Sequence, residues 1–572
     1  MTIWWLAGCL EARVAHLEDQ VAGLERDIAS AERVVAAMKA KLDRARDHVI
    51  PVRNDLDPQG FDGERTIPRG DPSRPDVILL SIDTLRADHL GAYGYERDTS
   101  PFIDALAREG SRFEDAWSPS PWTLPSHTTM LSGYTPLRHG SIEDDLPISA
   151  NVPLIQEKFR DAGYATVGAV ATLFVSSRYG FDRGFDHFVD FGVHSTKLNN
   201  LSTVDADHVF HHALHFLQEA PAGKPVFAFV HVYDAHFAYN APPPFNEKFD
   251  RKAQLGDAIY KNYHDYKKSM IDDEQLAHQV AQYDEEIAFV DAKFRELVET
   301  WRASGREVIV VLSADHGEEF GERGSWGHGH TLWREQLHVP LIVNGPGIRT
   351  QVVKGRVGTE DIAPTIAGLV GLESWPSDGV DRTQTLKTGA PVPSRAARLA
   401  ETSRFDTIRY RWHEAPWEFQ LDAATGARHL CQVVEDPWCQ TNRVEAAPDK
   451  AAAMEAGLLK AIGDGWKAVA DGRVASQDGI PYIDGKRSKG GGDVTAGTAF
   501  AVLPLDARVS FNVGGAQRGP WRGIASPFPE ATDGLEFLGP RSVAIQQTAA
   551  EKELLATLGY MDHDEPEKPA PE

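Results

Sequence analysis

Residues 308–317 read Val-Ile-Val-Val-Leu-Ser-Ala-Asp-His-Gly, an apolar run that ends at one carboxylate and one imidazole. Residues 77–82 and 226–230 are similar apolar runs. Short runs of this kind, without polar alternation, are typical of strands that are buried on both faces of a sheet. Stretches with helical patterning, such as residues 279–300, lie between them. The sequence therefore predicts an α/β fold with a mostly parallel central sheet flanked by helices.

Polar side chains follow each of the three runs. They are Asp83 after the first, His231, Asp234 and His236 after the second, and Asp315 and His316 after the third. A lone Asp or His in such a place is usually a turn, a cap or an ordinary core residue. The carboxyl ends of the strands in an open α/β sheet lie at one edge, so we expect these side chains to converge. Mixed carboxylate and imidazole ligands suit Zn²⁺ or Mn²⁺ better than Ca²⁺, which prefers oxygen ligands alone.

A fourth segment, residues 118–127, places Thr123 two positions before Pro125 and ahead of a helical pattern. Proline is tolerated in a first helical turn, so Thr123 is expected at or near a helix N-terminus. The positive end of the helix dipole and the free N–H groups there favour an alkoxide or a bound oxyanion. Taken alone, the same pattern fits a threonine that only caps the helix.

Composition narrows the class of protein. The chain has 572 residues, 42% of them hydrophobic, and a formal net charge of −25. Its 13 Trp and 25 Phe residues exclude a wholly disordered chain. The sequence has no stretch of about 18 consecutive apolar residues, which argues against a polytopic membrane protein. The acidic balance argues against nucleic acid as a partner, and an anionic substrate would need a locally positive site.

Together, the motifs resemble the sulfatase family of the alkaline phosphatase superfamily. The matching stretches are residues 81–88, 123–133, 313–318, 327–333 and 339–342, and they occur in the family's order within about residues 75–390. The resemblance implies an alkaline-phosphatase-like sheet with a smaller C-terminal antiparallel sheet. It also implies a metal-dependent hydrolase that cleaves sulfate or phosphate esters by in-line attack.

Carried over by position, the resemblance assigns roles to individual residues. Asp83, Asp315 and His316 would hold one divalent metal ion, with Mn or Zn favoured over Ca by the ligand set. Thr123 would be the nucleophile and would also touch the metal. The remaining predicted catalytic residues are His236 and His328, which would contact the transferred group or protonate the leaving oxygen, and His127.

The chain also departs from the pattern of well-studied arylsulfatases. Their nucleophile is a Cys or Ser that is converted to formylglycine, and Thr123 cannot form that aldehyde. His127 replaces an Arg and Thr84 replaces a second Asp, while Ala169 and Ala171 align with a Lys-x-His pair. The combination of Asp83, Thr123, Asp315 and His316 is closer to family members that use Thr to transfer phosphoryl groups. A phosphodiester or phosphonate hydrolase, a phosphoryl transferase acting on a cell-envelope substrate, and a catalytically silent binding module remain alternatives.

The N-terminal sequence predicts attachment to a membrane through a lipid and assembly into an oligomer. Residues 6–9, Leu-Ala-Gly-Cys, resemble a bacterial lipobox, in which Cys9 would carry a lipid. Residues 1–5 are short and uncharged for a signal sequence, so a chance match or a misassigned start codon remains open. Apolar residues from 14 to 45 alternate in steps of three and four, which predicts a coiled coil and a homo-oligomer through residues 12–47. A helix packed on its own domain is the alternative.

The remaining boundaries follow from composition. Residues 51–74 are predicted as a linker, 75–395 as the catalytic domain and 396–483 as a C-terminal α+β subdomain. Residues 484–572 are predicted to hold a flexible loop or linker at 484–493, an unassigned segment that could add strands, and an acidic tail. Cys431 and Cys439 either form a disulfide or remain two core thiols. A disulfide would indicate an exported protein, either periplasmic or lipid-anchored in the cell envelope.

Overall fold

The computed structural model describes residues 66–191, 204–237, 239–250, 272–392, 398–405 and 407–462, and then 466–468, 470–476, 480–483, 486–488, 491–496, 498–503, 508–513, 516–522 and 535–537. The predicted lipobox, the coiled coil and the acidic tail lie outside these residues, as do residues 51–65 of the predicted linker. Among the helices that the structure describes, none combines the length and the apolar composition that crossing a bilayer requires.

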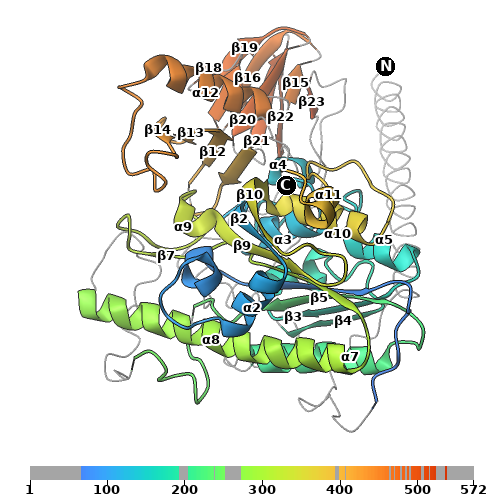
Figure 1. Ribbon diagram of the computed structural model, residues 1–572. Coiled ribbons are helices and arrows are strands. Elements are labelled where there is room, and N and C mark those ends of the chain that lie inside the picture. The colour runs from blue at the N-terminus through green and yellow to red at the C-terminus, as the bar shows by residue number, and fades with distance from the viewer. Residues whose placement is uncertain are drawn as a thin grey trace, which may run out of the picture. The chain divides into compact units, whose positions relative to one another are not determined.

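The centre of the fold is an eight-stranded sheet in the order β10-β2-β9-β6-β1-β5-β3-β4 (Figure 1). All pairings are parallel except the two that β9 makes with β2 and β6. This arrangement confirms the predicted mostly parallel sheet. The strands are β1 (Asp76–Ile82), β2 (Ser111–Trp117), β3 (Ala165–Val170), β4 (His187–Asp190), β5 (Val226–Val232), β6 (Val308–Ser313), β9 (His338–Asn344) and β10 (Gln351–Gly358).

Strand β1 contributes side chains to two separate cores. Ile78 and Leu80 pack in the core that includes residues of helices α2, α7 and α8, whereas Val77 and Leu79 pack in the core that includes residues of α3, α5 and α10. Successive side chains of a strand point to opposite faces, so a strand with helices on both sides has no polar alternation. Each fully buried Val, Ile or Leu contributes about 1.5 to 3 kcal/mol of transfer free energy.

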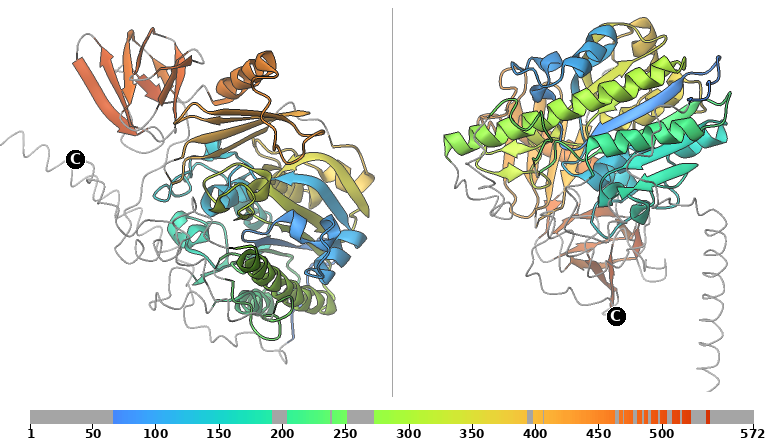
Figure 2. Two further views of the ribbon diagram at one scale, coloured as in Figure 1. Left: turned by 90° about the vertical axis from the view of Figure 1, so that its left-hand side faces the viewer. Right: turned by 90° about the horizontal axis from the view of Figure 1, so that it is seen from below.

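Helices cover both faces of the sheet, with the long α8 running alongside α7 on one of them (Figures 1 and 2). The helices on that face are α2 (Pro101–Glu109), α7 (Ala206–Glu219) and α8 (Asp273–Ala303). Those on the other face are α3 (Thr123–Ser132), α5 (Ile155–Asp161), α10 (Ile362–Leu369) and α11 (Thr383–Thr388). Shorter elements are α4 (Pro136–His139), α9 (Arg334–Leu337), β7 (Glu319–Phe320), β8 (Trp326–Gly327) and five 3₁₀ turns at 87–89, 91–93, 173–175, 177–179 and 359–361.

The two strands beside β1 are β5 and β6, and both are parallel to it. Ser81 near the end of β1 is in register with His231 of β5 and Ser313 of β6. The carboxyl ends of these three strands therefore lie side by side, which is the convergence that the apolar runs predict.

A second sheet follows the catalytic region. Four antiparallel strands in the order β11-β12-β13-β14 share a core with helix α12. Their bounds are β11 (Arg398–Thr402), β12 (Arg409–Glu414), β13 (Trp417–Asp422), β14 (Arg428–Gln432) and α12 (Pro448–Ile462). The smaller C-terminal antiparallel sheet implied by the family resemblance is thus present.

The chain beyond α12 contains further described strands. It forms two further sheets, β18-β17-β20-β15-β23 and β19-β16-β21-β22, and β17 pairs with β18 in antiparallel fashion. Within residues 484–493, the described residues 486–487 form β18 and residues 492–493 begin β19. The strands are β15 (Trp466–Ala468), β16 (Gly472–Ser476), β17 (Ile480–Ile483), β18 (Lys486–Arg487), β19 (Gly492–Val494), β20 (Ala499–Leu503), β21 (Arg508–Val513), β22 (Ala516–Arg522) and β23 (Leu535–Phe537).

Candidate active site

Asp83, Asp315 and His316 meet beyond the ends of β1 and β6. Each offers one possible ligand atom, and these atoms lie within 4.8 Å of one another. The Nε2 atom of His316 is 3.2 Å from Asp315 Oδ2 and 3.7 Å from Asp83 Oδ1. All three side chains are fully buried. His316 Nδ1 donates to the Gly317 carbonyl at 3.0 Å, which leaves the Nε2 lone pair facing the two carboxylates.

The backbone beside Asp83 adopts an uncommon conformation. Thr84 has a φ of 55°, which is rare for a β-branched residue and typical of functional sites. Its N–H donates to Asp315 Oδ1 at 3.2 Å, and its carbonyl accepts from the Tyr283 hydroxyl at 2.8 Å. Thr84, which stands in place of the family's second Asp, therefore helps to hold Asp315.

Helix α3 begins at Thr123, as the sequence predicts, and Trp122 is its N-cap residue. The Thr123 side chain is fully buried, and its Oγ1 lies 3.5 Å from His316 Nε2. That distance is long for a hydrogen bond, but it leaves room for an ion shared by the two atoms. The structure therefore brings Thr123 into the same corner as Asp83, Asp315 and His316.

His127 lies one helical turn after Thr123 and uses both ring nitrogens. Its Nδ1 donates to the Thr123 carbonyl at 2.9 Å, and its Nε2 accepts from the Ser81 hydroxyl at 2.9 Å. Burial lowers the pKa of His127 to about 3, so the ring is neutral. These contacts attach α3 to β1, and this geometry favours a positioning role for His127 over a chemical one.

His236 and His328 lie next to the predicted metal ligand His316. The ring centroids of His316 and His328 are 4.4 Å apart, and those of His236 and His328 are 4.9 Å apart. Glu318, also buried, lies 3.1 Å from His328 Nδ1 through its Oε1. Such a contact fixes the ring orientation and directs Nε2 of His328 away from Glu318.

Three residues near the site were not assigned a role from the sequence. His231 lies within β5, and its Nε2 is 3.2 Å from Asp83 Oδ2. Glu318 orients His328, and Arg404 of the β11–β12 turn stacks on Trp122. From the sequence, His231 is expected to converge on the site without an assigned role, and Glu318 adjoins a recognisable motif from which it could have been proposed. Arg404 lies far from those motifs in the chain, and no local pattern marks it.

The donor set fits a divalent cation. Asp83 Oδ1 and Asp315 Oδ2 are buried and accept no hydrogen bond, which is costly for a carboxylate without a charge partner. Burial, with the nearby Asp315 charge, raises the pKa of Asp83 well above its ordinary value. Burial opposes ionisation of Asp315 as well, but His316 beside it outweighs burial and lowers the pKa of Asp315. A cation between the two carboxylates would offset their repulsion.

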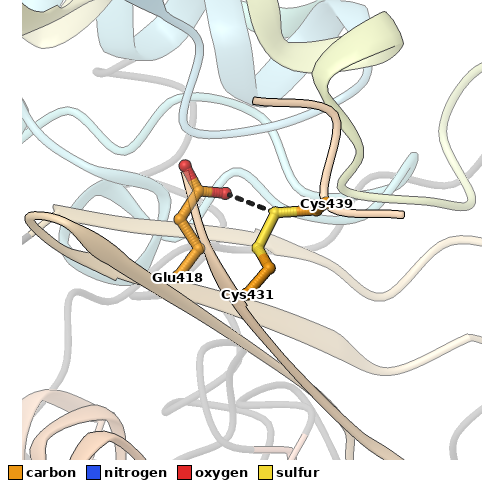
Figure 3. Close-up of side chains that lie close together, drawn as sticks. All are labelled: Glu418, Cys431 and Cys439. Carbon is orange, nitrogen blue, oxygen red and sulfur yellow. Dashed lines mark hydrogen bonds between the residues drawn. A yellow bond between two sulfur atoms is a disulfide. The ribbon is translucent and has the colours of Figure 1, made fainter. Parts of the chain in front are cut away.

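A second cluster of possible ligands has another explanation. Cys431 and Cys439 form a disulfide beside Glu418, so neither sulfur is a thiolate (Figure 3). The Glu418 carboxylate accepts from Arg411 at 2.8 Å and from Arg356 at 2.7 Å. This cluster is a covalent cross-link beside a buried ion-pair network, and its two guanidinium groups would repel a metal ion.

Comparison with known proteins agrees with the fold and the motifs. Residues 75–372 match the Sulfatase family. The chain is 23% identical over 414 residues to the ulvan-active sulfatase of Formosa agariphila, covering 67% of this chain and 79% of that protein. It is 21% identical over 435 residues to the choline-sulfatase of Rhizobium meliloti, covering 65% and 83% of the two chains.

Solved structures show the same fold. The phosphonate monoester hydrolase of Agrobacterium radiobacter superimposes with a TM-score of 0.57 at 19% identity, covering 68% of this chain and 95% of that one. The family match extends over more than half of the chain. The protein therefore belongs to the sulfatase family of the alkaline phosphatase superfamily and is a hydrolase of sulfuric or phosphoric esters.

Proposed function

We propose that the protein cleaves sulfate or phosphate esters by in-line attack of the Thr123 hydroxyl. Asp83, Asp315, His316 and Thr123 would together hold one divalent ion, with Mn²⁺ or Zn²⁺ favoured by the mixture of oxygen and nitrogen ligands. The observation that carries this proposal is the position of Thr123 Oγ1, 3.5 Å from His316 Nε2 at the N-terminus of α3. If Thr123 served only to cap helix α3, there would be no reason for the buried carboxylates of Asp83 and Asp315 to lie beside it.

The chemistry follows from the groups in this corner. When bound, the ion would lower the pKa of a neighbouring hydroxyl and balance negative charge on the ester oxygens. Thr123 Oγ1 forms a bond to phosphorus or sulfur while the bond to the leaving alcohol breaks. One of His236 and His328 accepts the proton of the Thr123 hydroxyl and passes it to the departing oxygen, and water then hydrolyses the threonyl ester. Glu318 orients His328 for this role.

The nucleophile favours phosphorus among the possible substrates. Thr123 cannot become formylglycine, so an attack by the unmodified hydroxyl on a phosphodiester or phosphonate is our preferred form of the reaction. The fold shared with a phosphonate monoester hydrolase is consistent with that preference. Transfer of the phosphoryl group to a cell-envelope acceptor would use the same threonyl intermediate.

Replacement of Thr123 by Val tests the proposal. Thr123→Val keeps the side-chain shape and removes the attacking oxygen, so we expect kcat/KM to fall at least about 1,000-fold. The assay uses the full chain with Mn²⁺ or Zn²⁺ and aryl sulfate, aryl phosphate, phosphodiester and phosphonate esters. Thr128→Val is the matched control, because Thr128 is buried in the same helix and donates only to the Leu124 carbonyl. Equal activity of the two variants would exclude Thr123 as the nucleophile.

We also propose that the protein is exported. The disulfide between Cys431 and Cys439 supports this location, because disulfides persist mainly in oxidising compartments. Lipid attachment through Cys9 would then hold the enzyme at the cell envelope. Fractionation of the native cells, with labelling by a radioactive fatty acid, tests both statements, and unlabelled protein in the cytosol would contradict them.

A further inference from the structure

The turn between β11 and β12 lies against both segments that border the site. The Glu401 N–H, at the end of β11, donates to the Pro119 carbonyl at 2.9 Å, just ahead of Thr123 in the chain. The Thr402 hydroxyl donates to the carbonyl of Gly329, the residue after His328, at 2.5 Å. This turn follows the matched family region, which ends at residue 372.

Arg404 is the charged residue of this turn, and it is only 7% exposed. Its guanidinium carbon lies 4.1 Å from the ring centroid of Trp122 and 5.1 Å from that of Phe174. Its Cδ lies 3.2 Å from the point where a Cβ on Gly329 would stand, and Gly329 has a φ of 90°. The arginine is thus held between the residue before Thr123 and the residue after His328.

The physical properties of this arginine suit an oxyanion. A guanidinium carries its charge at any pH that the protein tolerates, and its planar donors match the oxygens of phosphate, phosphonate or sulfate. Charges interact more strongly in a buried site than in water. The chain as a whole carries a net charge of −25, so an anionic ester needs positive groups close to Thr123.

We propose that Arg404 binds a non-bridging oxygen of the tetrahedral oxyanion on which Thr123 acts. The substrate class in this statement rests on the proposed function, whereas the binding of an oxyanion can be measured without turnover. Arg404 would then be supplied to the catalytic domain by the turn between β11 and β12. Its stacking on Trp122 and Phe174 fixes the guanidinium before the substrate arrives.

Binding of inorganic phosphate and of inorganic sulfate provides the first test. Both anions are titrated calorimetrically into the full chain loaded with Mn²⁺. The variant Arg404→Met keeps much of the aliphatic stem and removes the charge, and we expect the tighter of the two anions to bind about 10- to 100-fold more weakly. The matched control is Arg112→Met, which removes a guanidinium stacked at 4.8 Å on Tyr93, outside the site. A loss of binding confined to the Arg404 variant supports the proposal.

Kinetics provide the second test, because a purely structural role would lower the amount of folded enzyme without changing KM. We expect Arg404→Met to raise KM for the ester about tenfold or more, and Arg404→Lys to recover part of that loss. If wild-type enzyme cleaves no ester, the proposed function fails and anion binding alone decides on Arg404. Wild-type protein that binds neither anion, or equal anion affinity in Arg404→Met and Arg112→Met, would overturn the inference.

Should Arg404→Met not fold, the pair Arg404→Lys and Arg112→Lys replaces it in the same titrations. Lysine keeps the charge but loses the planar fork, so a threefold or larger loss of anion affinity in Arg404→Lys alone supports the proposal. Equal affinities in this pair overturn it.

Discussion

Asp83 and Asp315 place two carboxyl groups in a corner that has no contact with solvent. One oxygen of each accepts no hydrogen bond, and burial raises the pKa of Asp83 well above its ordinary value. A carboxyl whose pKa is raised on folding stabilises the protein at low pH, and this contribution is lost as the pH rises through the folded-state pKa. The metal-free fold is therefore under electrostatic strain that a bound cation would relieve.

Replacing Asp83 by Asn should have opposite effects with and without metal. In EDTA at pH 7, we expect Asp83→Asn to unfold at a higher temperature than wild type, because a buried carboxyl that resists ionisation is replaced by a neutral amide. With Mn²⁺ at about 100 times its Kd, wild type should gain about 2.7 kcal/mol and the variant much less. Thermal unfolding measures both effects, and Asp161→Asn, at an exposed position, is the control. An equal gain from Mn²⁺ in both proteins would rule out Asp83 as a ligand.

The N-terminus of α2 shows how one element is completed by another. Ser100, its N-cap residue, makes no side-chain capping bond. Instead, the Asp291 carboxylate of α8 accepts from Phe102 N at 3.0 Å and from Ile103 N at 2.7 Å. Asp291 is buried, and burial raises its pKa to about 6. The charged form is thus costly even though it caps a helix.

Asp291→Asn should make stability less dependent on pH. Because the folded-state pKa of Asp291 is raised, its favourable contribution is complete below pH 4 and is lost as the pH rises through 6. We expect the wild-type free energy of unfolding to fall relative to the variant by up to about 3 kcal/mol between pH 4 and pH 7, at about 1.4 kcal/mol per pKa unit. Urea unfolding of both proteins at several pH values measures this difference. Parallel profiles would contradict it.

The disulfide also stabilises a single element, because it links β14 covalently to the turn that follows. Closing a short loop of about nine residues corresponds to about 2 to 3 kcal/mol in the chain-entropy model. We expect the Cys431→Ala/Cys439→Ala variant to lose that amount of unfolding free energy in the antiparallel β11–β14 sheet. Limited proteolysis followed by mass spectrometry would locate the change. Unaltered cleavage within residues 398–462 would show that the cross-link adds little there.

At the scale of the whole molecule, the predicted coiled coil concerns assembly. Residues 12–47 lie outside the described residues, so the homo-oligomer remains a prediction from the heptad pattern. We expect the full chain to sediment as an oligomer and residues 51–572 to sediment as a monomer. Sedimentation equilibrium of both forms measures the masses. A monomeric mass for both would contradict the prediction.

Local sequence patterns were enough to predict the central sheet and the convergence of Asp83, Asp315 and His316. Apolar runs without alternation predicted strands buried on both faces, and the polar residues after them predicted where Asp83, Asp315 and His316 would meet. The Thr-x-Pro segment predicted the start of α3 at Thr123. These features are readable because strand burial and helix initiation depend on neighbouring residues.

Only the tertiary structure decided which distant groups complete that site. Arg404 packs on Trp122 and Asp291 caps α2, although nothing in their own neighbourhoods marks these roles. The pairing of β17 with β18 is another contact that the composition of this part of the chain does not reveal. Contacts of this kind depend on how separate elements pack together, and local propensity carries no information about a partner far away in the chain.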